Sequence, residues 1–208
     1  EKLNTRFISK KTEVLNHLGS TVIDDPEQAR FWRDDPHFTM MCGRTNDYEG
    51  LRDGLTTMRA RFPAVLEYAL VGMKDEPKDG LIEIHSVMSP EDIQQVVDLH
   101  YAIVEAGLPF NADSHCDLFD QTNLEGYAHA NLQYCGFPAA RGLFKAHASL
   151  GRVNEELREC IDYLVEPAVF DPAGLYRSPG LILGRLPTKE DDPTFTPFAL
   201  EPIEVKKC

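Results

Sequence analysis

Apolar residues recur along the chain in two different periods, and the difference separates expected helices from expected strands. A spacing of three to four residues places side chains on one face of a helix, whereas alternation places them on one face of a strand. The helical period follows a capping residue at Asn46 or Asp47 and ends near Pro63, and it returns between Ser89 and Gly107. The apolar stripes of these two predicted helices consist of Leu51, Leu55 and Met58, and of Ile93, Val96, Val97 and Val104.

Runs of bulky and β-branched residues predict strands around these helices. The expected strands span residues 37–42, 65–73, 81–87, 141–150, 181–186 and 195–205. Turn residues at 74–80 and at 188–193 would close two hairpins. A third helix is predicted after Asn154, whereas residues 108–135 show neither period and predict a long ordered loop.

The order of these elements favours an α+β fold with antiparallel sheets, because it lacks the regular strand–helix–strand alternation of a doubly wound sheet. With 208 residues, the chain is long enough to bury a substantial core as one domain. We therefore expect a single domain over residues 1–208. Residues 1–33 would form an N-terminal extension or the helices of a first lobe, and residues 108–135 a loop-rich insert.

The charge of the chain limits the partners that it can bind. It has 34 acidic and 21 basic side chains, which give a net charge of −13 at pH 7. Affinity for nucleic acid depends largely on basic side chains that displace condensed counterions, so a long duplex is an unfavourable partner. No apolar run approaches the ~20 residues of a membrane span, and the five cysteines include no Cys-x-x-Cys pair. We expect a soluble, monomeric cytoplasmic protein with reduced thiols.

Two short segments 110 positions apart share one pattern. In His37-Phe38-Thr39-Met40 and in His147-Ala148-Ser149-Leu150, a hydroxyl residue follows a histidine by two positions, and a Gly-Arg pair comes soon after each segment. In a strand, positions i and i+2 face the same side, about 6–7 Å apart. Each segment would therefore place an imidazole and a hydroxyl on one face of a sheet, and neighbouring strands would bring four such groups together.

These paired motifs resemble those of the 2H phosphoesterases, a family named for two His-x-Thr/Ser-x segments. The resemblance extends over roughly residues 34–205 and includes the approach to the second motif at Phe144–Arg152. It implies a bilobed α+β fold, with two antiparallel β-sheet lobes around a central cleft and helices on the outer faces. It also implies hydrolysis of a small cyclic or 2′-5′-linked nucleotide or of an RNA end, as in RNA processing, with a 2′,3′-cyclic phosphate as the leading substrate.

The chemistry of such a diester suits these residue types. Hydrolysis needs a base for the attacking water and an acid for the leaving oxygen, and an imidazole with a pKa near 6.5 can serve as either. His37 and His147 are the candidate acid and base, in either order. Thr39 and Ser149 could donate hydrogen bonds to the non-bridging oxygens, and Arg152 could contact the phosphate. This scheme requires neither a metal nor another cofactor.

Other histidines compete for these roles. His129-Ala130-Asn131-Leu132 also has a polar residue two positions after a histidine and is the main rival of the second motif, but no Gly-Arg pair follows it. His85 ends an expected strand and could face the same sheet surface, yet a lone histidine at such a place is more often structural. His100 and His17 are also expected to be structural.

Two functions of other classes stay open at this stage. The same fold could be a non-catalytic module that binds a nucleotide or a protein, with paired motifs that hold a phosphate without cleaving it. A zinc enzyme built on His115, Cys116 and Cys135 is less favoured, because the spacing of these residues matches no compact zinc pattern.

Overall fold

A computed structural model describes residues 38–63, 66–78, 81–112, 124–152, 174–178, 180–185 and 199–203, with Thr12 and Asn16. Its principal helices are α4 (Tyr48–Arg59), α5 (Pro90–Gly107) and α6 (Gly126–Cys135), and two short 3₁₀ turns are η1 (Leu108–Phe110) and η2 (Arg141–Leu143). The strands are β1 (Leu66–Lys78), β2 (Leu81–Met88), β3 (His147–Arg152), β4 (Gly174–Ser178), β5 (Leu181–Arg185) and β6 (Ala199–Ile203). The helix expected after Asn154 lies outside the described residues.

Local capping signals explain where α4 and α5 begin. The Asp47 carboxylate accepts a hydrogen bond of 2.8 Å from the Gly50 amide, which would otherwise lack a partner at the start of α4. The Ser89 hydroxyl accepts from the Asp92 amide at 3.2 Å, and Pro90 occupies the first helical position of α5. Both helices were predicted with these starts, and the predictions are confirmed.

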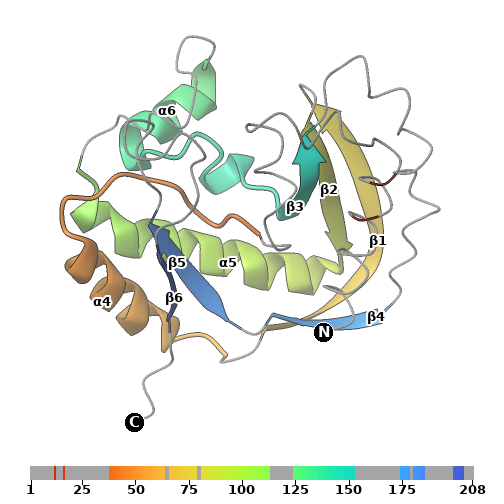
Figure 1. Ribbon diagram of the computed structural model, residues 1–208, viewed down its shortest axis with the longest axis horizontal. Helices are drawn as coiled ribbons and strands as arrows, with labels where there is room; N and C mark the ends of the chain where they lie inside the picture. Colours follow the sequence, from red (N-terminus) through yellow and green to blue (C-terminus); the bar gives the residue numbers. More distant parts are fainter. Residues whose placement is uncertain are drawn as a thin grey trace.

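Within the described part of the chain, four antiparallel strands form the larger sheet, in the order β3-β2-β1-β4. The predicted antiparallel pairing of residues 65–87 is confirmed, but it extends further than expected, because β1 continues to Lys78, the register partner of Leu81. Among the described strands, β3 lies at an edge of the sheet beside β2 (Figure 1). Its first residue, His147, is the register partner of His85 on β2. The sheet therefore holds the second motif at a defined register.

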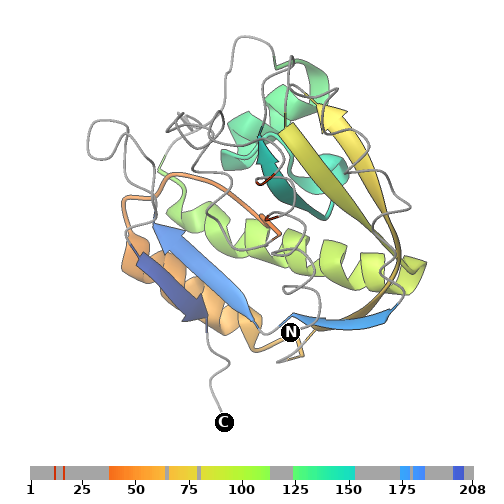
Figure 2. The same cartoon turned by 45° about the vertical axis from the view of Figure 1, so that its right-hand side comes forward.

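The smaller sheet consists of β5 and β6, which pair antiparallel from Leu181↔Ile203 to Arg185↔Ala199. The C-terminal hairpin expected from residues 181–186 and 195–205 is confirmed. Figures 1 and 2 both show this hairpin beside α4, and Ile203 joins the core formed by α4 and α5.

Several elements differ from those expected. Residues 38–42 of the first expected strand form no strand but run over α5, where the Met40 carbonyl accepts a hydrogen bond from the His100 side chain. The strand expected at 141–150 begins only at His147, because η2 occupies its first part. The loop expected at 108–135 contains η1 and the whole of α6. β4 was not predicted, because its five residues include few apolar ones.

α5 is the element around which the rest of the described structure packs (Figures 1 and 2). One core cluster lies between α4, α5 and β6, and a second lies between α5 and the end of α6. The buried members of the two clusters are Leu55, Met58, Leu99, Ile103 and Ile203, and Val104, Cys135, Phe137 and Ala140. Of the stripe expected for α5, Val96 and Val104 are buried, whereas Ile93 is largely exposed.

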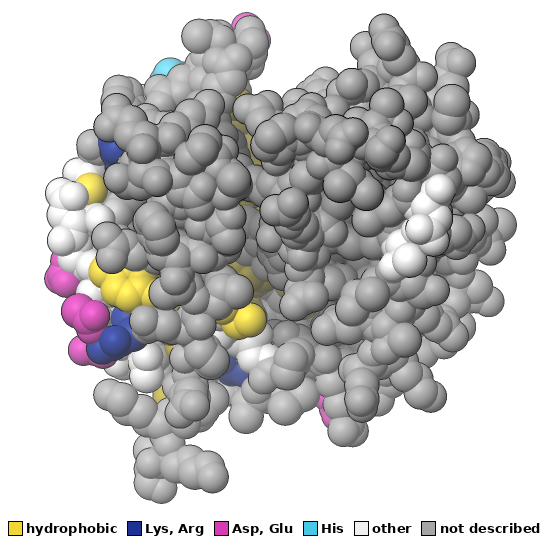
Figure 3. All heavy atoms as spheres, viewed as in Figure 1, with side chains coloured by type: hydrophobic (Ala, Val, Ile, Leu, Met, Phe, Trp, Pro, Cys, Tyr) yellow, Lys and Arg dark blue, Asp and Glu magenta, His cyan; other side chains and the backbone are white. Residues whose placement is uncertain are grey.

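Charged side chains gather on the outer surface of α4, where acidic and basic atoms adjoin in Figure 3. The Arg52 guanidinium lies 2.5 Å from the Glu49 carboxylate and 3.9 Å from that of Asp53. Exposed pairs of this kind contribute little to stability. Among the described residues, none of the helices has the length and apolarity needed to span a membrane. The two-lobed α+β arrangement itself stays a prediction.

Candidate functional site

A buried histidine, His100 of α5, connects the two parts of the chain that carry the paired motifs. Its side chain is 0% exposed. Its Nδ1 lies 2.7 Å from the carbonyl oxygen of Met40, the last residue of the first motif. Its Nε2 lies 2.8 Å from the backbone nitrogen of Arg141, which precedes the second motif by six residues. One imidazole therefore spans the gap between the two segments.

These two partners define the protonation state of His100. A carbonyl oxygen only accepts, so Nδ1 carries the hydrogen and donates it to Met40. The Arg141 amide only donates, so Nε2 must be an unprotonated acceptor. Burial lowers the pKa of His100 below its ordinary value of 6.5, and the hydrogen bond to Met40 only partly opposes this effect. The bridge is thus made by a neutral imidazole.

Aromatic rings enclose this imidazole. The Phe144 ring stacks on it with a centroid distance of 4.0 Å and an interplanar angle of 6°. Phe137 and Tyr101 approach it edge-on at 6.4 and 5.8 Å. Phe144 follows η2 and is the third residue before His147, so the stack also positions the chain that leads into β3.

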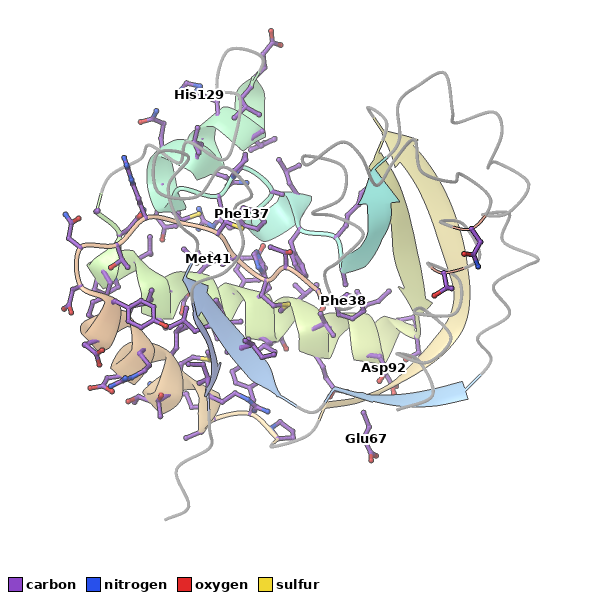
Figure 4. The ribbon with its side chains drawn as sticks, in the orientation of Figure 1. Phe38, Met41, Glu67, Asp92, His129 and Phe137 are labelled. Atoms are coloured by element: carbon purple, nitrogen blue, oxygen red, sulfur yellow. The ribbon has the colours of Figure 1, made fainter. Side chains whose placement is uncertain are left out.

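Each motif histidine is three residues from a residue that contacts His100: His37 precedes Met40, and His147 follows Phe144. Three residues of extended chain reach at most about 11 Å. Figures 1 and 2 show the segment that begins at Phe38 running along α5 from the side where β3 starts toward α4, and Figure 4 shows Phe38 at the end nearer β3. The described part of the first motif and the chain that leads into the second motif are therefore held by the same histidine.

The η2 turn is held in an unusual backbone conformation. Arg141 has a φ of 56°, in the left-handed region that residues other than glycine rarely adopt. Three contacts favour this conformation. The Arg141 amide donates a hydrogen bond to His100, and the Arg141 guanidinium lies 4.4 Å from the centre of the Tyr134 ring. The Phe144 amide also donates a hydrogen bond of 2.9 Å to the Arg141 carbonyl. Strain at a single residue persists only where its surroundings compensate for it.

α6 buttresses this turn from the other side. The buried Asn131 amide donates to the Ala140 carbonyl at 2.7 Å and to the Pro138 carbonyl at 3.2 Å. Gly136 ends α6 with a φ of 74° and donates to Leu132 at 2.9 Å, the usual left-handed termination of a helix. The approach to the second motif is therefore fixed by both α5 and α6.

The structure argues against His129 as a substitute for His147. His129 and Asn131 lie on a helix rather than a strand, and residues two apart on a helix lie on different faces. His129 is exposed at the outer part of α6 (Figure 4), whereas Asn131 is buried and uses its amide for Pro138 and Ala140. The weak apolar pattern of α6, with no side-chain cap, is the reason that this helix was not predicted.

Cys135, a member of the less favoured zinc site, is buried and hydrogen-bonded within the protein. Its Sγ donates to the Asn131 carbonyl at 3.3 Å, and burial raises the pKa of the thiol, which opposes the thiolate that a metal requires. His115 and Cys116 lie outside the described residues. Among residues whose side chains the structure describes, no three histidine, cysteine or acidic side chains gather closely enough to hold a metal ion.

The second motif occupies defined positions in β3. His147 begins the strand opposite His85, Ser149 pairs with Glu83, and Arg152 ends the strand opposite Leu81. A bulge lies between the pair Glu83–Ser149 and the next pair, Ile82–Gly151. The strand predicted for this motif is thus present over its histidine and hydroxyl positions, in the same alternation that the sequence indicated.

The first motif is only partly described. His37 lies outside the described residues, and Thr39 is half-buried in the extended segment before Met40. Met40 and Met41 pack against the core of α4 and α5 and thereby fix this segment. His100 was expected to be structural, and it is. Its role in joining the two motifs could not have been foreseen, because the sequence places it 60 residues from Met40 and 41 from Arg141.

The neutral state of His100 predicts a specific pH dependence of stability. The folded state resists protonation of this group, whereas the unfolded chain binds a proton below about pH 6.5, so the free energy of unfolding should fall as the pH drops below that value. The loss attributable to one proton is at most about 1.4 kcal/mol per pH unit. Urea denaturation at pH 7.5, 6.0 and 5.0 would measure it. The His100→Phe variant, which lacks the titrating group, should lose less stability over this interval; an equal loss would contradict the assignment.

Comparison of the chain with family models, with curated proteins and with solved structures finds no significant match. The function is therefore inferred from the residues and their arrangement.

Proposed function

We propose that the protein hydrolyses a small phosphodiester, most plausibly a 2′,3′-cyclic or 2′-5′-linked nucleotide, with His37 and His147 as the acid and base. The observation that carries the proposal is the His100 bridge, because it joins the segment that follows one motif histidine to the segment that precedes the other. The bridge supports the proposal because it brings two segments whose motif histidines are 110 positions apart in sequence to one buried side chain.

The reaction follows from the roles of two imidazoles. One neutral imidazole accepts a proton from water as the water oxygen forms a bond to phosphorus. The other, protonated, donates its proton to the leaving oxygen as the second phosphorus–oxygen bond breaks. The hydroxyls of Thr39 and Ser149 would donate to the non-bridging oxygens, where negative charge accumulates in the transition state. Arg152 would neutralise part of the phosphate charge.

The net charge of −13 restricts the size of the substrate. A single phosphate can be bound by a few local donors, but an extended backbone needs many basic contacts. The proposal therefore specifies a mononucleotide, a dinucleotide or one RNA end rather than a long strand or a duplex.

A substrate panel tests the proposed activity directly. The full chain would be incubated with 2′,3′-cyclic mononucleotides, 2′-5′-linked dinucleotides and 3′-5′-linked dinucleotides, with a chelator such as EDTA present, and the products would be separated by chromatography. We expect turnover of at least one of the first two classes despite the chelator. Binding without turnover would instead support the non-catalytic nucleotide module, and neither binding nor turnover would contradict both functions.

A further inference from the structure

Two rows of chemically active residues cross the four-stranded sheet where β3 begins. The first row consists of Lys74 on β1, His85 on β2 and His147 on β3, and the second of Glu76, Glu83 and Ser149 on the same three strands. Register partners in antiparallel strands share a face of the sheet, and so do residues two apart on one strand. All six positions therefore occupy one face, and they include a second histidine that the proposed reaction does not use.

Three of these positions have the spacing and chemistry of a metal-binding set. Glu83 and His85 are two positions apart on β2, and His147 is the register partner of His85 on the edge strand. General strand geometry separates such Cα atoms by about 7 Å along the strand and about 5 Å across the pair. Two imidazoles and one carboxylate are a common ligand set for Zn²⁺, with a fourth position left open.

We propose that Glu83, His85 and His147 form a binding site for a divalent transition cation of the Zn²⁺ class. Transition cations of this class bind imidazole readily, whereas Mg²⁺ and Ca²⁺ take mainly oxygen ligands. The register partners of His85 and Glu83 on β1 are Lys74 and Glu76, which carry opposite charges. With Glu83, these positions carry one net negative charge, which suits a cation better than an anion.

Occupancy of the site would regulate the proposed reaction, and this part of the inference rests on the proposed function. A cation bound to a nitrogen of His147 uses the lone pair that the base needs and displaces the proton that the acid needs. The same histidine therefore cannot bind the cation and transfer a proton in the same molecule. Zinc would act as an inhibitor, and its removal would restore turnover.

Zinc binding is tested without any activity measurement. The full chain, stripped of metal, would be titrated with Zn²⁺ in competition with a chromophoric chelator. Alongside it would be titrated the variants His85→Asn, His147→Asn and Glu83→Gln, and, as a control, His129→Asn, which changes an exposed histidine of α6. Loss of one ligand of three should weaken the tightest zinc affinity by about tenfold or more, whereas the control should leave it unchanged.

Two results would overturn the site: undiminished zinc affinity in His85→Asn, or an equal loss in the His129→Asn control. Thermal melting in the absence of metal identifies any variant that fails to fold. If a histidine variant fails to fold, Glu83→Gln, which keeps size and hydrogen bonding, takes its place in the test. A Cys116→Ser variant separates this site from the one on His115, Cys116 and Cys135. If that variant loses the affinity and His85→Asn keeps it, the proposed trio is wrong.

The regulatory part is measured on whichever nucleotide is turned over. Zinc should inhibit the wild-type chain, and in His85→Asn the concentration needed for inhibition should rise by the same factor as the binding constant, since both report one site. Inhibition that is unchanged by His85→Asn would contradict the regulatory link. Because zinc affinity is measured independently, loss of the zinc site and absence of phosphodiesterase activity are distinguishable results.

Discussion

Replacement of His147 or His37 by alanine is expected to lower kcat/KM for the cyclic nucleotide by about 10³-fold, the range typical of a lost general acid or base. The expectation follows from the proposed roles, in which each imidazole handles one of the two protons. It does not depend on which histidine is the acid. The measurement is the initial rate of diester hydrolysis, compared with that of His129→Ala, which removes an exposed histidine of α6 that lies away from Phe38 of the first motif (Figure 4).

A double variant sharpens this test. Groups that act as one unit show non-additive losses, so His37→Ala combined with His147→Ala should be little worse than either change alone. Independent, multiplying losses would indicate that the two histidines serve different functions. Full activity in either single variant, with a native melting temperature, would refute the two-histidine mechanism. A bell-shaped dependence of kcat/KM on pH in the wild-type chain, with one limb missing in each single variant, would support it.

Replacement of His100 by alanine should destabilise the folded state by about 3 kcal/mol or more. The change removes a fully buried ring that stacks on Phe144 and leaves a cavity. It also removes the hydrogen-bond partners of the Met40 carbonyl and the Arg141 amide. Each such buried group without a partner costs about 1–3 kcal/mol. Chemical denaturation monitored by circular dichroism at neutral pH would give the difference.

Two further variants divide this loss into its causes. His100→Phe keeps an aromatic ring against Phe144 but makes neither hydrogen bond, so it should recover only part of the stability. Gln95→Ala, at an exposed position of the same helix, should change it by about 0.5 kcal/mol or less. A His100→Ala loss no larger than that of Gln95→Ala would mean that His100 does not hold the two segments.

The stability and activity predictions have different physical origins, and this difference makes them informative together. His100 touches no substrate in the proposed reaction; it positions Met40 and Arg141 and, through them, the two motif segments. A His100→Phe chain that still folds at low temperature should therefore show a reduced kcat with an unshifted pH profile. Loss of a motif histidine should instead alter the profile while leaving the melting temperature nearly unchanged.

Local signals in the sequence were sufficient wherever a few neighbouring residues decide the structure. The starts of α4 and α5 follow from Asp47 and Ser89, because capping satisfies amides within the same turn. The hairpin of β1 and β2 follows from alternation and turn chemistry, although its length does not. The placement of a histidine and a hydroxyl residue on the same face of β3 follows from the same alternation.

The sequence failed where distant groups supply the hydrogen bonds. Residues 38–42 have the composition of a strand, but they lie over α5, and the Met40 carbonyl accepts from His100 instead of a neighbouring strand. η2 replaces the first part of an expected strand because the Arg141 amide also bonds to His100. α6 has little periodicity of its own, and its Asn131 amide donates to Pro138 and Ala140 beyond the helix end.

By itself, the sequence determined the acidic character of the protein, the starts of α4 and α5, its hairpins and the two His-x-Thr/Ser motifs, since each depends on composition or on residues a few positions apart. Only the tertiary structure decided that His100 joins the motif segments and that His85 is the register partner of His147. These relations connect residues 41 to 62 positions apart, and packing and strand register, rather than local propensity, determine such distant pairs.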